Sequence, residues 1–191
     1  MKTESKILRL LIDENHQFTI REISQKIKSD YKITHTAVQR LLKKKILLSE
    51  TIGKSTLCRL NEANYSIEVY ESENERKETI FKNKNIKNLY QEVMSKLSTK
   101  FFIFLIFGSY AKGKQTSSSD IDIMLVSNEK GFEERILDIL SLLPIKTHPL
   151  VFTEEEFIRM KDAKKLNVVK EAIGNNVILY GAETYYWLKN A

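Results

Sequence analysis

Two aspartates separated by a single residue, Asp120 and Asp122, are the side chains in this sequence that most clearly indicate chemistry. They open the apolar run 120–126, which predicts a buried strand. Residues two apart in a strand point to the same face, so the two carboxylates project together. Like charges this close either raise each other's pKa or recruit a cation. We therefore expect both to ligate a hard divalent ion, Mg²⁺ or Mn²⁺, that also binds triphosphate oxygens.

A glycine–serine pair precedes these aspartates at the end of another apolar run. The seven residues 101–107, Phe-Phe-Ile-Phe-Leu-Ile-Phe, predict a buried strand that stops at Gly108 and Ser109. Gly108 allows the backbone to approach a ligand closely, and amide groups at the start of the following short helix would face a phosphate. Gly108, Ser109 and Lys112 are therefore the candidate nucleotide-binding residues, with a nucleoside triphosphate (NTP) as the ligand.

The third strand that must lie near this pair of strands is predicted at about residues 144–153. It contains no Asp or Glu, and His148 is its ionisable residue near the level of the aspartates. Glu154, Glu155 and Glu156 follow the strand. With Thr153 as an N-cap, they are best interpreted as complementing the positive end of the next helix.

Strand, Gly-Ser bend, helix and then Asp-Ile-Asp on an apolar strand together resemble the signature of the nucleotidyltransferase fold shared with DNA polymerase β. The match is nearest to the small minimal nucleotidyltransferases and covers roughly residues 80–182. The resemblance implies that Gly108 and Ser109 hold the nucleotide phosphates and that Asp120 and Asp122 ligate the metals. It also implies a third acidic residue on the next strand, acting as metal ligand and base. Because this residue is missing, His148 is the candidate substitute base or ligand.

Charge is distributed unevenly along the 191 residues, whose formal net charge is +6. Residues 1–65 contain 13 of the 31 Lys and Arg but only 7 of the 25 Asp and Glu, so the remainder holds 18 of each. The entire positive excess therefore lies in the first third of the chain. This asymmetry predicts two modules, of which the first has a polyanionic partner.

Three helices and a hairpin are predicted within that basic third. A first helix spans roughly residues 3–13, and a second begins after Thr19, with Glu22 as its capping-box partner. The third helix is expected to begin at Thr34 or Thr36, and strand-like alternation then flanks a turn at Gly53-Lys54.

This order of elements resembles a winged helix-turn-helix domain, which implies that the third helix enters the major groove of duplex DNA. Gln39 and Arg40 are best suited to reading base edges, whereas the lysines supply phosphate contacts. The candidate DNA-binding residues are Thr36, Gln39, Arg40, Lys43, Lys44 and Lys54. Two alternatives stay open: a solvated basic helix with no nucleic-acid role, and a winged helix used for dimerisation.

The expected domains are residues 1–65, a linker and amphipathic helix at 66–97 (the helix over roughly 76–97), and residues 98–191. The fold class is mixed α+β: a winged helix-turn-helix domain followed by an α/β nucleotidyltransferase-fold domain with a mixed β-sheet. The single cysteine, Cys58, excludes an internal disulfide. The longest apolar run is far shorter than the ~20 residues that span a bilayer, so we expect a cytoplasmic protein without a membrane partner.

Two functions compete at this stage. In the first, the second domain transfers a nucleoside monophosphate from Mg²⁺-NTP to a hydroxyl of a small molecule or a protein. A toxin is one candidate acceptor, because the minimal nucleotidyltransferases include antitoxins that modify a partner toxin. In the second, the chain is a catalytically silent transcriptional regulator or antitoxin whose nucleotidyltransferase-like domain senses nucleotide or mediates dimerisation. A homodimer is expected for a helix-turn-helix protein that reads paired half-sites.

Overall fold

The computed structural model describes residues 2–53, 55–64 and 66–191. The chain divides into two units, Met1–Asn74 and Glu75–Ala191, and the division falls within helix α4 (Ile67–Ile80). The segment 66–97, expected to be a linker followed by a helix, is therefore shared: residues 66–74 belong to the first unit and residues 75–97 to the second.

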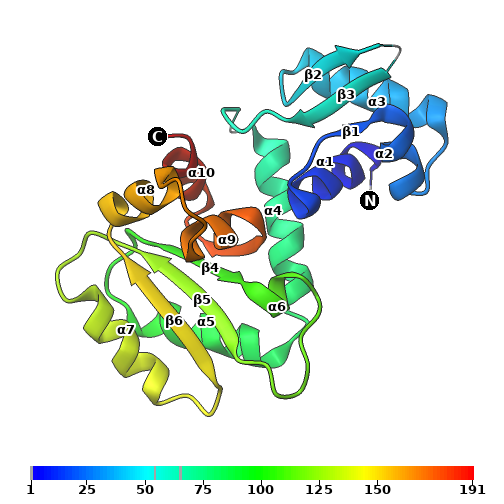
Figure 1. The fold of residues 1–191 in the computed structure, drawn as a ribbon. Coiled ribbons are helices and arrows are strands. Elements are labelled where there is room, and N and C mark those ends of the chain that lie inside the picture. The colour runs from blue at the N-terminus through cyan, green and yellow to red at the C-terminus, as the bar shows by residue number, and fades with distance from the viewer. Residues whose placement is uncertain (1, 54, 65) are drawn as a thin grey trace. The chain divides into compact units, whose positions relative to one another are not determined.

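The first unit contains three complete helices, the start of α4 and a three-stranded antiparallel sheet (Figure 1). The sheet has the strand order β1-β3-β2, with Cys58 of β3 between Phe18 and Ser49 of its two neighbours. Each fully buried aliphatic side chain contributes about 1.5–3 kcal/mol, so apolar burial is the main stabilising term. The elements are α1 (Thr3–Glu14), β1 (Phe18–Thr19), α2 (Ile20–Lys26), α3 (Tyr31–Lys43), β2 (Leu47–Ile52) and β3 (Ser55–Leu60). The buried residues include Ile7, Leu11, Ile23, Val38, Leu41 and Cys58.

Local capping explains where the helices of this unit begin. Thr19 and Glu22 form the predicted capping box at the start of α2. The prediction that α3 begins at Thr34 or Thr36 is wrong, because Asp30 caps it four residues earlier. The Asp30 carboxylate accepts from the amides of Lys32 at 2.8 Å and Ile33 at 3.2 Å. Thr34 is buried inside the helix, where its hydroxyl donates to the Asp30 carbonyl.

The prediction of one helix over roughly residues 76–97 is wrong, because two helices are present, α4 (Ile67–Ile80) and α5 (Lys84–Lys96). The chain breaks before α5 because the side chain of Asn83 accepts hydrogen bonds from the amides of Asn85 and Ile86, which ends one helix and caps the next. The apolar residues that predict the helix run from Ile86 to Leu97, all after this break, so the pattern contains no signal for it.

The second unit is built on a four-stranded mixed sheet, as the sequence predicted (Figure 1). Its strand order is β6-β5-β4-β7, with β4 antiparallel to both β5 and β7 and with β5 parallel to β6. The parallel pair is connected by a crossover through α7. The elements are β4 (Ile103–Phe107), α6 (Gly108–Ala111), β5 (Ile121–Val126), α7 (Phe132–Ser141), β6 (Thr147–Phe152), α8 (Glu154–Asp162), α9 (Val168–Gly174), β7 (Asn176–Tyr180) and α10 (Ala182–Asn190).

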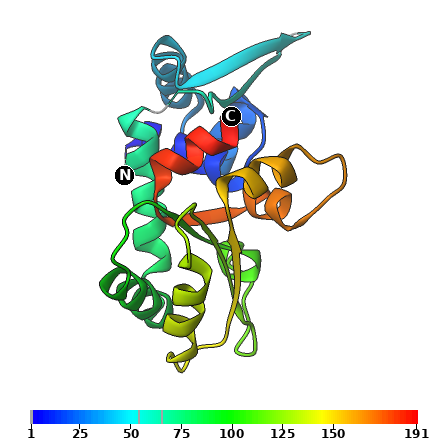
Figure 2. The same ribbon diagram turned by 90° about the vertical axis from the view of Figure 1, so that its left-hand side faces the viewer.

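Helices cover both faces of this sheet. Figures 1 and 2 show α5 and α7 together on one face and α8 and α9 on the other. The side chains of Ile121, Ile123 and Leu125 belong to the core formed with α5 and α7. Because side chains alternate along a strand, Asp122 points toward the opposite face. None of the described helices is long and apolar enough to cross a lipid bilayer.

Candidate active site

The sharp bend after β4 lies directly against Asp122. Antiparallel pairing of Ile106 with Ile123 brings Asp122 to the end of β4, where the chain turns into α6 at Gly108. Gly108 has a φ of +68°, and a Cβ built there would overlap Oδ2 of Asp122 and come within 3.0 Å of its Cγ. The Asp122 carboxylate therefore occupies space that exists only because residue 108 has no side chain. This contact explains in packing terms why the bend requires glycine.

His148 lies on the other side of the same carboxylate. In the parallel ladder Asp122 is paired with His148, and Nδ1 of the imidazole is 3.4 Å from Oδ1 of Asp122. The Asp122 side chain is 29% exposed and that of His148 is 64% exposed, so the pair opens to solvent. The carboxylate thus has Gly108 at one oxygen and an imidazole at the other.

Asp120 is exposed and lies one residue before β5, so it is not fixed in the strand as the sequence predicted. The residue just before Asp120 is hydrogen-bonded to α6, because the Tyr110 hydroxyl donates to the carbonyl of Ser119 at 3.4 Å. Within the described part of the chain, no group of three or more His, Cys, Asp or Glu side chains is arranged to hold a metal ion. The structure therefore brings Asp122 and His148 together and places Asp120 two residues before Asp122, at the entrance to the strand.

The three glutamates after β6 are far from this pair. Glu156 completes a capping box with Thr153, whose backbone amide and hydroxyl donate to Oε2 at 2.9 Å and 3.0 Å. These hydrogen bonds, the backbone one first, lower the pKa of Glu156. At about 3.3 Å per residue, the five residues from His148 to Thr153 span about 16 Å. The glutamates thus cap α8, as expected, and cannot replace a carboxylate at His148.

Two further residues of the candidate phosphate site make contacts that the sequence did not predict. Ser109 is partly exposed, and its carbonyl accepts from the amide of Lys114 at 2.9 Å. Lys112 is exposed, with its Nζ 3.5 Å from Oε1 of Glu171 on α9. No local pattern indicates this pair, because the two residues lie 59 positions apart in the sequence.

The donors around Gly108 fit a small divalent cation. Carboxylate oxygen and imidazole nitrogen are both common ligands of divalent metals, and the missing Cβ at residue 108 leaves Oδ2 of Asp122 uncovered by a side chain there. Asp120 is exposed two residues before Asp122, at the entrance to β5. Asp122 and His148 are therefore the two residues placed together to hold a metal, and Asp120 is the next carboxylate along the chain.

The candidate DNA-binding residues of the first unit divide into two groups. Thr36, Gln39 and Lys43 are exposed on α3. Gln39 also lines a hollow between α2, α3 and β3, together with Arg21 and Gln25. These polar side chains form the outward surface of the helix. Lys54 lies outside the described residues.

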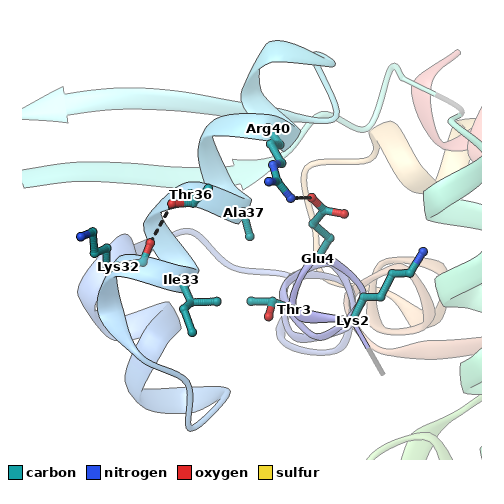
Figure 3. A pocket seen from close by; sticks show the side chains of 8 residues that line it. All are labelled: Lys2, Thr3, Glu4, Lys32, Ile33, Thr36, Ala37 and Arg40. Atoms are coloured by element: carbon teal, nitrogen blue, oxygen red, sulfur yellow. Dashed lines mark hydrogen bonds and ion pairs between the residues drawn. The ribbon is translucent and has the colours of Figure 1, made fainter.

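Arg40 and Lys44, in contrast, form ion pairs within the first unit. Figure 3 shows Arg40 bending toward the start of α1, where its Nη1 lies 3.6 Å from Oε1 of Glu4. Lys44 Nζ is 2.6 Å from Oε1 of Glu68 on α4. The contact raises the pKa of Lys44 and lowers that of Glu68. Both cations therefore have acidic neighbours that offset their charge.

Comparison with protein families gave one match. Residues 84–185 match the family described as Polymerase beta, Nucleotidyltransferase. The match covers just over half of the 191 residues and includes Gly108, both aspartates and His148. No curated protein and no solved structure matched the chain.

Proposed function

The chain belongs to the polymerase β nucleotidyltransferase family, and from this premise we propose that its second unit binds an NTP with Mg²⁺ or Mn²⁺ and transfers the nucleoside monophosphate to a hydroxyl. The observation that carries the proposal is the Asp122 carboxylate, held between Gly108 and His148 at the end of β4. A bend that requires glycine, next to a carboxylate open to solvent, provides adjacent positions for phosphate and cation.

In the proposed reaction, the acceptor hydroxyl loses its proton to solvent and its oxygen bonds to the α-phosphorus. The bond from the α-phosphorus to the oxygen that bridges to the β-phosphorus breaks, and pyrophosphate leaves. Gly108 and Ser109 bind the phosphates through the backbone and the Ser109 hydroxyl, and Lys112 adds a positive charge. Asp120 and Asp122 hold the cation, which when bound neutralises phosphate charge and polarises the reacting oxygens. His148 takes the place of the third carboxylate.

A transfer assay tests this proposal. Purified protein is incubated with labelled ATP, GTP, CTP or UTP, Mg²⁺ or Mn²⁺, and candidate hydroxyl acceptors, including any toxin encoded beside it. We expect label transfer that Asp120→Ala abolishes and that Asp138→Ala, an exposed aspartate on α7, leaves unchanged. Transfer that is equal in all three proteins would contradict the assigned site.

The missing third carboxylate supports a second candidate, a catalytically silent regulator. Loss of a base and metal ligand can reduce a rate by orders of magnitude while nucleotide binding persists. In this case the second unit senses nucleotide or mediates dimerisation. Saturable nucleotide binding that depends on Asp122, without transfer to any acceptor, would favour this candidate over the enzyme.

For the first unit, we propose a winged helix-turn-helix domain that binds duplex DNA as a homodimer. Support comes from the helix and strand order, the sheet order β1-β3-β2 and the exposed polar residues Thr36, Gln39 and Lys43 on α3. Binding should fall steeply with salt, because cationic side chains displace counterions from phosphates. Unchanged DNA affinity in a Gln39→Ala/Lys43→Ala variant would contradict groove binding by α3. Analytical ultracentrifugation tests the dimer directly.

A further inference from the structure

The imidazole of His148 is held beside Asp122 by the sheet itself. Parallel pairing of β5 with β6 sets Asp122 opposite His148, so the side chains project from neighbouring strands on the same face. Their atoms Nδ1 and Oδ1 are 3.4 Å apart. Two ligands bound at about 2.1 Å from one small ion can be at most about 4.2 Å apart, so both atoms can reach the same ion.

The carboxylate oxygen of Asp122 and the imidazole nitrogen of His148 favour different metals. Mg²⁺ binds oxygen ligands and rarely accepts nitrogen, whereas imidazole suits transition metals, whose affinity for nitrogen sites rises from Mn²⁺ through Co²⁺. Carboxylates from Asp120 and Asp122 alone would suit Mg²⁺. Addition of a nitrogen donor changes that preference.

We infer that His148 is a metal ligand through Nδ1, and that it makes this site prefer Mn²⁺ or Co²⁺ to Mg²⁺. The inference builds on the proposed function, since it concerns the metal-binding residues of the same site. The glutamates that follow β6 cannot replace the missing carboxylate, because they lie in the first turn of α8, at the end of the strand remote from His148. His148 is the side chain that the parallel ladder pairs with Asp122.

Metal titrations of the full-length protein without nucleotide test the preference. Mn²⁺ binding is followed by the electron paramagnetic resonance signal of the free ion, and Co²⁺ and Mg²⁺ binding by calorimetry. We expect wild-type protein to bind Mn²⁺ more tightly than Mg²⁺. His148→Asp, which replaces the nitrogen donor by an oxygen donor, should reduce this ratio, because Mg²⁺ gains an oxygen ligand while Mn²⁺ loses its nitrogen ligand. His35→Asp, the same change at an exposed histidine of α3, is the matched control and should leave the ratio unchanged.

A spectroscopic measurement identifies the ligand directly. Electron spin echo modulation of bound Mn²⁺ detects a coordinated ¹⁴N nucleus. The modulation should be present in wild type and in His35→Asp, and absent in His148→Asp. Mn²⁺ that binds with no nitrogen modulation, or with an unchanged metal ratio in His148→Asp, overturns the inference.

The same titrations separate this inference from the proposed function. Mn²⁺ bound with oxygen ligands only, together with nucleotide binding that Asp122→Asn abolishes, removes the role of His148 and leaves the nucleotidyltransferase proposal standing. Metal and nucleotide binding that are equally absent in wild type and in Asp122→Asn overturn both proposals.

Discussion

The contact between Gly108 and Asp122 yields the sharpest test of the site. Alanine at position 108 introduces one methyl group at a residue whose φ is +68°. That methyl group overlaps Oδ2 of Asp122, so either the backbone leaves its left-handed conformation or the carboxylate moves away. Both responses separate the bend from the carboxylate, which is the arrangement that the proposed function requires.

The size of the effect follows from two separable costs. A side chain in the left-handed region costs about 1–2 kcal/mol, which reduces stability. Displacement of the Asp122 carboxylate adds a second cost, which appears mainly in ligand binding because Asp122 is partly exposed. Loss of one well-placed ligand corresponds to a factor of at least about ten in affinity, or about 1.4 kcal/mol.

Gly113 supplies the matched control. Its φ is +63°, yet a Cβ there would meet nothing within 4 Å among the described atoms. Gly113→Ala should therefore cost about 1–2 kcal/mol in stability and leave nucleotide and Mn²⁺ affinity unchanged. Gly108→Ala should lose a similar or larger amount of stability and also weaken nucleotide and Mn²⁺ binding by at least about tenfold. Denaturant unfolding and fluorescent-nucleotide titration measure the two quantities.

Gly181 distinguishes a general packing defect from a specific one. It also has a positive φ, of +76°, and a Cβ there would collide with the backbone of Phe102 and Ile103, away from the candidate site. Gly181→Ala should destabilise the fold while the folded fraction binds nucleotide normally. Nucleotide binding by Gly108→Ala that is as tight as that of Gly113→Ala would contradict a specific role for the Gly108–Asp122 contact. Binding weakened as much in Gly181→Ala as in Gly108→Ala would contradict it as well.

Three other expectations follow from the contacts of single residues. In DNA binding, Lys43→Ala should reduce the slope of log affinity against log salt by about 0.9. The double variant Lys44→Met/Glu68→Gln, which leaves the net charge unchanged, should leave the slope unchanged, because Lys44 is already paired with Glu68. Equal slopes in the two variants would contradict this. Glu156→Gln should remove part of the acid sensitivity of thermal unfolding. Because the pKa of Glu156 is lowered in the folded state, its stabilisation is full above the usual pKa and is lost as pH falls through the folded value. An equal fall in melting temperature from pH 7 to pH 4 in wild type and in Glu156→Gln would refute this. Cys58 is fully buried and burial raises its pKa, so a thiol reagent at pH 8 should label it only after denaturant is added.

Local sequence signals predicted the parts of the structure that short-range interactions decide. The capping box of Thr19 with Glu22 and the N-cap at Thr153 each involve residues within one helical turn, so the pattern alone predicts them. The start of α3 was missed because Asp30, Thr34 and Thr36 are all capable N-caps. Burial of Thr34 against the rest of the first unit decides the outcome, and the linear sequence does not contain that information.

The ion pairs of the basic helix show a different limit. Lys44 and Glu68 are 24 residues apart and Arg40 and Glu4 are 36 apart, so their contacts depend on tertiary packing. From the sequence alone, Arg40 and Lys44 are candidate DNA-binding residues on the same footing as Lys43. In the structure, the acidic neighbours reduce the charge that the C-terminal end of α3 presents, and the residues best placed to contact a partner become Thr36, Gln39 and Lys43.

The topology of the sheet, rather than any single motif, creates the candidate site. Because α7 returns the chain so that β6 runs parallel to β5, the start of β6 lies beside the start of β5, and His148 reaches Asp122. If β6 ran antiparallel to β5, its C-terminal end would lie beside Asp122 and would place Val151 or Phe152 there. Neither side chain can accept a proton or bind a metal. The antiparallel pairing of β4 then brings Gly108 to the same edge from the other side. One parallel and one antiparallel neighbour are both required for Gly108, Asp122 and His148 to meet, so a mixed sheet is a structural condition for this chemistry.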